Sequence, residues 1–302
     1  KQRFHPTRRR LLQGLGAAAA ATAVPRFAYA QGSPVKIGLI LPMTGPFAST
    51  GRQITAACKL FMQTHGDSVA GRKVELIVKD DTGLAPETTK RIAQEMVVQD
   101  KVTFLAGFGL TPLAFAAAPV ATEAKTPMIV MAAGTQVIPQ RSPYIVRTGF
   151  TLPQTTSPIA GWAYKNGIKR VFTLVTDYAP GLDSEKTFIT RYKEAGGEIV
   201  ESVRTPLRNP DYGPFLQRAK DSKADALFVF VPSGEGLAVM KQFDERGLKQ
   251  AGMRMIGPGD VVDDDLLESM GAPAVGVITS FHYSAAHESP ENRAYVDGMM
   301  KA

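Results

Sequence analysis

Cysteine and histidine are scarce in this chain, and each shortage removes a class of chemistry. One of the 302 residues is a cysteine, Cys58, so no disulfide can form within the chain. Only four histidines are present, and three of them, His65, His282 and His287, follow the first thirty residues. None of these three stands at the short spacing that metal-binding side chains need. We therefore expect no metal site.

Motifs that bind nucleotides or activate a nucleophile are also missing. The chain has no P-loop and no G-x-S-x-G elbow, and Gly107-Phe108-Gly109 lacks the third glycine of a dinucleotide-binding turn. Asp80 and Asp81 are adjacent acids, but we expect them to hydrogen-bond the turn on which they lie. No nucleophile with a base in reach is visible. The sequence predicts that the protein is not an enzyme and carries no cofactor.

The net charge of +7 is concentrated at the N-terminus. Six of the 35 basic residues and none of the 28 acidic residues lie in the first thirty positions, so the rest of the chain has a net charge of +1. A protein that binds nucleic acid keeps a basic surface on its folded part. We therefore expect no nucleic-acid partner.

Residues 1–30 have the parts of a cleavable export signal. A basic start precedes an apolar stretch from Leu11 to Val24, and Ala28-Tyr29-Ala30 offers small residues for cleavage before Gln31. The apolar stretch is too short to anchor the mature protein, and no other segment approaches membrane-spanning length. A periplasmic location is predicted.

The basic start also suggests an export route. Thr7-Arg8-Arg9-Arg10-Leu11-Leu12-Gln13 resembles the twin-arginine motif, in which two arginines, one residue and two hydrophobic residues follow one another. The alternative is a general secretory signal that carries three arginines. We favour the twin-arginine route, by which a protein can cross the membrane already folded.

After the leader, short apolar runs alternate with amphipathic helices. Ile54, Cys58 and Phe61 fall on one face of a helix, whereas Ile129-Val130-Met131 is apolar on both sides, as a strand inside a parallel sheet must be. Strands are predicted at 35–41, 73–79, 102–106, 127–131, 145–148, 170–176, 198–204, 226–231, 253–257 and 275–280. Helices are predicted at 88–100, 112–124, 152–166, 182–195, 212–221, 236–246 and 290–301.

This alternation indicates βαβ units and parallel sheets. We predict an α/β fold of two doubly wound parallel-sheet lobes joined by a hinge, with lobe 1 at 31–150, lobe 2 at 151–280 and a return to lobe 1 at 281–302. The break between the lobes falls near Gly149–Pro153. Because nothing follows the helix at 290–301 and the chain begins with Lys1, we expect that a C-terminal portion is missing.

Several segments, taken in order, resemble one family. They are Lys36–Pro46, Gly51, Asp80-Asp81-Thr82, Thr176–Gly181 and Ser280–Tyr283. From Val35 to its last residue the chain resembles the type I periplasmic solute-binding proteins of ABC importers, most closely the Leu/Ile/Val-binding group. The resemblance implies two lobes that close on a small organic ligand like a hinge and then dock on the permease subunits in the inner membrane. We expect a monomer.

The ligand site is expected outside the carboxyl ends of the strands. In lobe 1 the loops at 43–49, 108–111 and 132–135 follow strands and bring Phe47 and Phe108 to the site. The resemblance implies that Thr111, Ala133 and Thr135 grip a ligand carboxylate through hydroxyl and backbone N–H groups. The relatives often have a serine pair where this chain has Thr111-Pro112, and Pro112 has no N–H to donate. Thr111 can instead serve as the N-cap of the next helix.

In lobe 2 the loops at 177–181, 232–235 and 257–261 face the same site. We expect Tyr178 to form a wall over the ligand. Asp260 is the first candidate to bind a ligand amine and Glu235 the second, although Asp260 can alternatively cap a helix together with Asp263–Asp265. Where branched-chain relatives have tyrosines, Ser233 lies between Pro232 and Gly234, which opens the pocket.

Two readings of the ligand and one other function remain open. The main reading is an amino acid of the branched-chain type, or a related small carboxylate or amide. One alternative is an aromatic carboxylate without an amine, because the open pocket has room for a ring. The other alternative is the ligand-sensing domain of an extracellular receptor.

Overall fold

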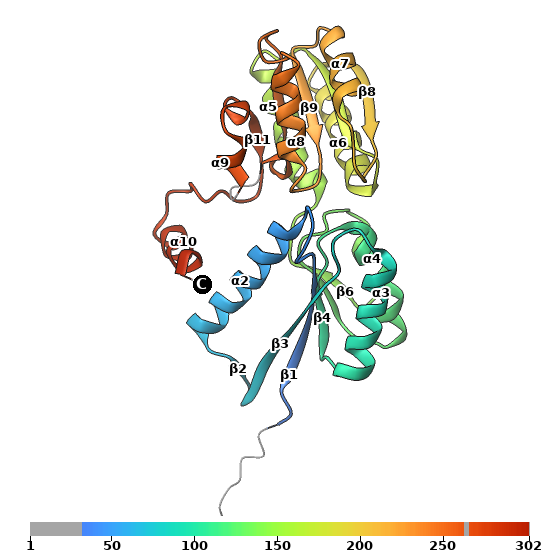
Figure 1. Cartoon of the computed structure of the whole chain (residues 1–302), viewed down its shortest axis with the longest axis vertical. Helices are drawn as coiled ribbons and strands as arrows, with labels where there is room; N and C mark the ends of the chain where they lie inside the picture. Colours follow the sequence, from blue (N-terminus) through green and yellow to red (C-terminus); the bar gives the residue numbers. More distant parts are fainter. Residues whose placement is uncertain (1–31, 263–265, 302) are drawn as a thin grey trace, which may run out of the picture.

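The computed structural model describes residues 32–262 and 266–301, and these form two β-sheets, each covered by helices (Figure 1). We call the first sheet with its helices lobe 1 and the second lobe 2. The export signal predicted at 1–30 and the possible capping residues Asp263–Asp265 lie outside the described residues.

The sheet of lobe 1 has the strand order β2-β3-β1-β4-β5-β6. Its strands are β1 (Val35–Leu41), β2 (Ser68–Val69), β3 (Arg72–Asp80), β4 (Phe104–Gly107), β5 (Met128–Val130) and β6 (Ile145–Arg147). Its helices are α2 (Ala48–His65), α3 (Pro86–Glu95) and α4 (Thr111–Glu123), with the helical turns η1 (Met96–Asp100) and η2 (Ile138–Arg141).

The sheet of lobe 2 has the order β11-β10-β9-β7-β8, and all its paired strands are parallel. Its strands are β7 (Arg170–Thr176), β8 (Glu198–Thr205), β9 (Ala226–Phe230), β10 (Arg254–Pro258) and β11 (Ile278–Ser280). Its helices are α5 (Leu152–Lys165), α6 (Ala179–Glu194), α7 (Gly213–Asp221), α8 (Gly236–Glu245) and α9 (Leu267–Met270), with the turns η3 (Gly259–Val261) and η5 (Ala272–Ala274). The predicted fold class is confirmed.

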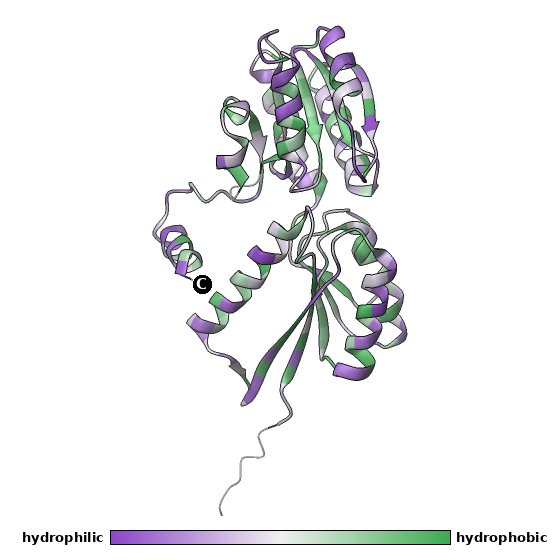
Figure 2. Ribbon diagram, viewed as in Figure 1, coloured by the Kyte–Doolittle hydropathy of each residue, from purple (hydrophilic) through white to green (hydrophobic). Residues whose placement is uncertain are grey.

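The central strand β9 is apolar throughout because both of its faces are buried. In β9, Leu227 and Val229 pack towards α7 and α8, whereas Phe228 and Phe230 pack towards α5 and α6. Side chains alternate across a strand, so a strand with helices on both faces favours apolar residues at every position. The hydropathy colouring shows the apolar strands enclosed by helices with polar outer faces (Figure 2).

One strand pair departs from the predicted parallel scheme. β2 and β3 run antiparallel. The two residues between them, Ala70 and Gly71, have φ angles of 49° and 74°. Positive φ at both central residues is the geometry of a tight hairpin turn, which reverses the chain within two residues.

The N-terminus of α6 lies three residues earlier than predicted, at Ala179. Pro180 stands in the first turn, where its missing N–H costs no hydrogen bond. Tyr178 is therefore the residue that precedes the helix, which places its side chain at the carboxyl end of β7.

The chain passes between the lobes twice in the described residues. The first crossing joins β6 to α5, and the second joins β11 to α10 (Pro290–Lys301). α10 lies beside α2 of lobe 1 (Figure 1). A β-carbon at Gly298 would lie 3.0 Å from the side chain of Leu60, so the two helices approach closely there. No helix in the described part of the chain is long and apolar enough to cross a membrane.

Candidate functional site

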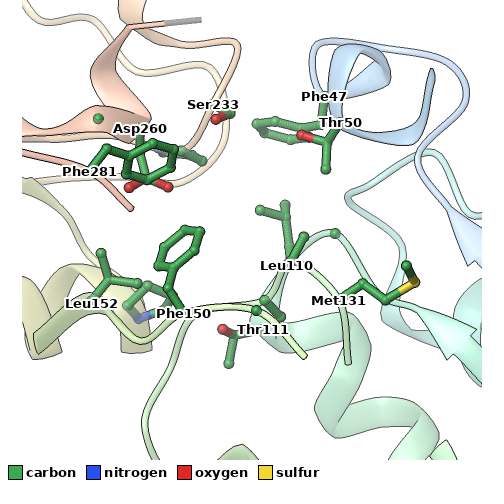
Figure 3. A pocket seen from close by; sticks show the side chains of 18 of the residues that line it. Phe47, Thr50, Leu110, Thr111, Met131, Phe150, Leu152, Ser233, Asp260 and Phe281 are labelled. Carbon is green, nitrogen blue, oxygen red and sulfur yellow. The ribbon is translucent and has the colours of Figure 1, made fainter. Parts of the chain in front are cut away.

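A cavity of about 260 Å³ lies between the two lobes (Figure 3). Its walls are the loops at the carboxyl ends of β1, β4 and β5 in lobe 1 and of β7, β9 and β10 in lobe 2, together with both crossings. Ligands of open α/β sheets bind at this end of the strands. The volume suits a ligand the size of one ring or one amino acid.

The loop after β1 is held in place by Asp80, the last residue of β3. Asp80 accepts hydrogen bonds from the backbone N–H of Met43 at 2.9 Å and of Thr82 at 2.8 Å, and from the Thr44 hydroxyl. Burial alone would raise the pKa of Asp80, but these donors hold it below its ordinary value. The loop thus fixed leads to Phe47, whose ring forms part of the cavity wall.

Thr111 and Thr135 are brought together in lobe 1. The Thr111 hydroxyl donates to the Thr135 hydroxyl at 2.9 Å, and each residue is only 1% exposed. Thr111 is the first residue of α4 and lines the cavity, whereas Thr135 lies behind it and does not. Pro112 has no N–H, and the N–H groups of Leu113 and Ala114 donate to the Leu110 carbonyl at 3.1 and 3.2 Å. The Thr111 N–H is therefore the group of this first turn that can bind an anion.

Of the two other residues predicted in lobe 1, one lines the cavity and one does not. Ala133 lines the cavity, but its N–H already donates to the Phe108 carbonyl at 3.0 Å. The Phe108 side chain is fully buried among the apolar residues of α3 and α4 and is not part of the cavity wall. Its φ of 67° is the cause, because this left-handed backbone turns the side chain away from the cavity.

Tyr178 and Asp260 meet in lobe 2. Both line the cavity, and the Tyr178 ring stacks on Phe230 with centroids 6.1 Å apart. Burial raises the pKa of Tyr178 well above its ordinary value, and the negative charge of Asp260 adds to the shift. Tyr178 is therefore a neutral hydroxyl at physiological pH, able to donate a hydrogen bond next to a carboxylate.

Of the other two residues predicted in lobe 2, only one lines the cavity. Ser233 lines the cavity. Glu235 does not: it precedes α8, and its Oε2 lies 3.5 Å from the Tyr212 hydroxyl. Burial raises the pKa of Glu235. Of the two acids considered for a ligand amine, Asp260 alone faces the cavity.

Aromatic residues of the crossings form the part of the wall that the sequence did not reveal. Phe150 of the first crossing packs edge-on against Phe281 of the second, with centroids 4.9 Å apart, and stacks on His282 at 4.5 Å. Figure 3 shows the Phe150 ring pointing into the space between Phe47 and Phe281. The two crossing segments could have been included in the predicted site, because chain segments that join two lobes must pass the bottom of the cleft between them.

The charge of the lining limits what can bind. No Lys or Arg is found among the described residues that line the cavity, and Asp260 is the one carboxylate there. An anionic group of a ligand would therefore be bound by N–H and hydroxyl donors, away from Asp260. Within residues 32–262 and 266–301, no group of three or more His, Cys, Asp or Glu side chains could hold a metal ion.

Comparison with known proteins agrees with this geometry. The family model described as "Periplasmic binding protein" matches residues 34–302. A Leu/Ile/Val-binding protein homolog 6 from Brucella melitensis is 44% identical over 269 residues, which cover 89% of this chain and 69% of that protein.

Two solved structures from Rhodopseudomonas palustris are similar over 89% of the chain. One, from strain BisB5, is a solute-binding protein of an ABC transporter in complex with 3,4-dihydroxybenzoic acid; it is 59% identical with a TM-score of 0.85, and 74% of it is covered. The other is a solute-binding protein in complex with 4-hydroxybenzoate; it is 40% identical with a TM-score of 0.86, and 73% of it is covered.

Proposed function

The chain belongs to the periplasmic binding protein family, as a solute-binding protein of an ABC transporter, and from that premise we propose that it captures a hydroxylated aromatic carboxylate. One observation carries the proposal. Aromatic rings line the cavity, the Thr111 N–H and threonine hydroxyls lie on the lobe 1 wall, and among the described lining residues a single carboxylate lies on the lobe 2 wall.

The two lobes contribute different polar groups to the cavity wall. Thr111 opens α4 in lobe 1, whereas Asp260 belongs to η3 in lobe 2. A benzoate with a hydroxyl opposite its carboxylate can place the carboxylate at Thr111 and donate a hydrogen bond from its hydroxyl to the Asp260 carboxylate. The ring between them would contact Phe47 and Phe150. The ligands named for the two R. palustris structures support this class.

A branched-chain amino acid is the second candidate. Asp260 supports it, because a buried amine needs an acidic partner. The name of the Brucella relative supports it too. Against it, the ligands named for the two R. palustris structures are aromatic carboxylates without an amine.

Calorimetric titration tests the proposal. We expect 3,4-dihydroxybenzoate and 4-hydroxybenzoate to bind about tenfold more tightly than benzoate, because a hydrogen bond to a charged group contributes about 1.5 kcal/mol or more. Asp260→Asn should weaken the hydroxybenzoates by about the same factor and leave benzoate unchanged. Recovery of each ligand unaltered is expected, since we propose a binding protein without catalysis. Tight binding of leucine and none of the benzoates would favour the second candidate.

The remaining features of the protein follow from family membership and from the sequence. A periplasmic or extracellular location and work with an ABC permease belong to the family. We also propose export by the twin-arginine signal at 1–30, a monomeric state, and the division into lobes at 31–150, 151–280 and 281–302. Ligand contacts at Thr111, Ala133, Tyr178, Ser233, Asp260 and Phe47 belong to the same proposal.

A further inference from the structure

A hydrogen bond joins the two lobes outside the cavity. The backbone N–H of Gln136, in the loop after β5 of lobe 1, donates to Oδ2 of Asp183 at 2.9 Å. Asp183 lies in the second turn of α6 in lobe 2 and is half-buried. Because donor and acceptor belong to different lobes, this bond exists only while the lobes are close together.

Arg147 of lobe 1 lies close to the Gln136–Asp183 hydrogen bond. It ends β6, and its guanidinium donates to the Thr135 carbonyl. Its Nε is buried and has no hydrogen-bond partner among the described residues. Burial lowers the pKa of Arg147, and the negative charge of Asp183 opposes that shift. The acid that compensates this half-buried cation therefore comes from the other lobe.

The contact is connected to the cavity wall through one residue. The Thr135 carbonyl is bound by Arg147, and the Thr135 hydroxyl accepts the hydrogen bond of Thr111. Gln136, which reaches Asp183, is the next residue along the chain. A shift of this loop therefore moves the Thr111 hydroxyl and the interlobe contact together.

We propose that Arg147 and Asp183 are positioning residues that couple the occupied carboxylate site to closure of the lobes. When the lobes close, Asp183 binds the Gln136 N–H and faces the Arg147 charge, and this fixes the loop that orients Thr111. A ligand carboxylate at Thr111 fixes the same loop from the other side. The coupling to a carboxylate depends on the proposed function, whereas the closure contact does not.

Two substitutions separate the hydrogen bond from the charge. Asp183→Ala removes both, whereas Asp183→Asn keeps an acceptor oxygen for the Gln136 N–H and removes the charge facing Arg147. Glu194→Gln is the matched control, because Glu194 is an exposed acid at the end of the same helix. The closed fraction can be measured from the distance between one spin label on α4 and one on α7, in a Cys58→Ser background.

Asp183→Ala should lower the closed fraction several-fold, both without ligand and with saturating 3,4-dihydroxybenzoate. It should also raise the dissociation rate of that acid about tenfold, with Asp183→Asn in between and Glu194→Gln equal to wild type. An unchanged closed fraction in Asp183→Ala would overturn the proposal. If neither 3,4-dihydroxybenzoate nor leucine binds the wild type, the proposed function fails, but the closed fraction of the unliganded protein still decides the role of Asp183.

Discussion

Gly181→Ala is expected to lower the free energy of unfolding by about 3 kcal/mol, at the upper end of the usual cost of overpacking. A β-carbon at Gly181 would lie 1.8 Å from the Thr176 carbonyl oxygen, and contacts this short do not occur. The obstructing atom belongs to the backbone of β7 and cannot rotate away as a side chain can. The first turn of α6 would have to move off the sheet.

The same movement should abolish ligand binding, because Tyr178 and Pro180 line the cavity between β7 and Gly181. Urea unfolding followed by the fluorescence of Trp162, the one tryptophan of the chain, reports on lobe 2. Gly161→Ala in α5 is the control, since nothing lies within 4 Å of its added β-carbon. This substitution should stabilise the helix by about 0.5–1 kcal/mol. If the urea midpoint of Gly181→Ala equalled that of wild type, α6 would be able to move away from β7 without loss of stability, and the prediction would be wrong.

Between pH 4 and pH 8, the difference in free energy of unfolding between Asp81→Asn and wild type should change by about 3 kcal/mol, which is the size expected from the pKa shift of Asp81. Asp81 is fully buried, and burial raises its pKa to about 6 from 3.8. Its carboxylate accepts hydrogen bonds from the Gly83 N–H at 3.0 Å and the Thr89 hydroxyl at 3.3 Å. An asparagine side chain can occupy the same place without a charge.

The sign follows from the direction of the shift. Below about pH 3.8 the acid is protonated in both the folded and the unfolded state, and the stability it contributes is fully present. As the pH rises through about 6 that contribution is lost, because the folded state must hold a buried charge. Relative to wild type, Asp81→Asn should therefore be more favourable at pH 8 than at pH 4. Denaturant unfolding at both pH values measures this difference.

Glu123→Gln is the control for this pH experiment. Glu123 is an exposed acid at the end of α4 in the same lobe, and its substitution should change stability by no more than about 0.5 kcal/mol at either pH. If Asp81→Asn showed the same small difference, the buried carboxylate would not be the group that titrates near pH 6.

Much of the fold could be predicted because its strands are buried on both faces. β9 is a continuous apolar run, and such a run between amphipathic helices indicates a parallel sheet. The β2–β3 hairpin was missed because its turn, Ala70-Gly71, lacks the asparagine or aspartate that marks such turns, and β2 has only two residues.

The candidate site was predicted in part. Phe47, Thr111, Tyr178 and Asp260 follow strand ends and do line the cavity. Phe108 also follows a strand end, yet it points into the core, because its backbone conformation rather than its position decides its direction.

The sequence by itself determined the fold class, the two-lobed arrangement and the ends of the strands where a ligand would bind, because these depend on local hydrophobic periodicity. Only the tertiary structure decided which side chains share one wall. Phe150 and Phe281, or Gln136 and Asp183, are far apart in the chain and meet through the relative orientation of the two lobes. That orientation results from packing across the hinge, and no local pattern of residues encodes it.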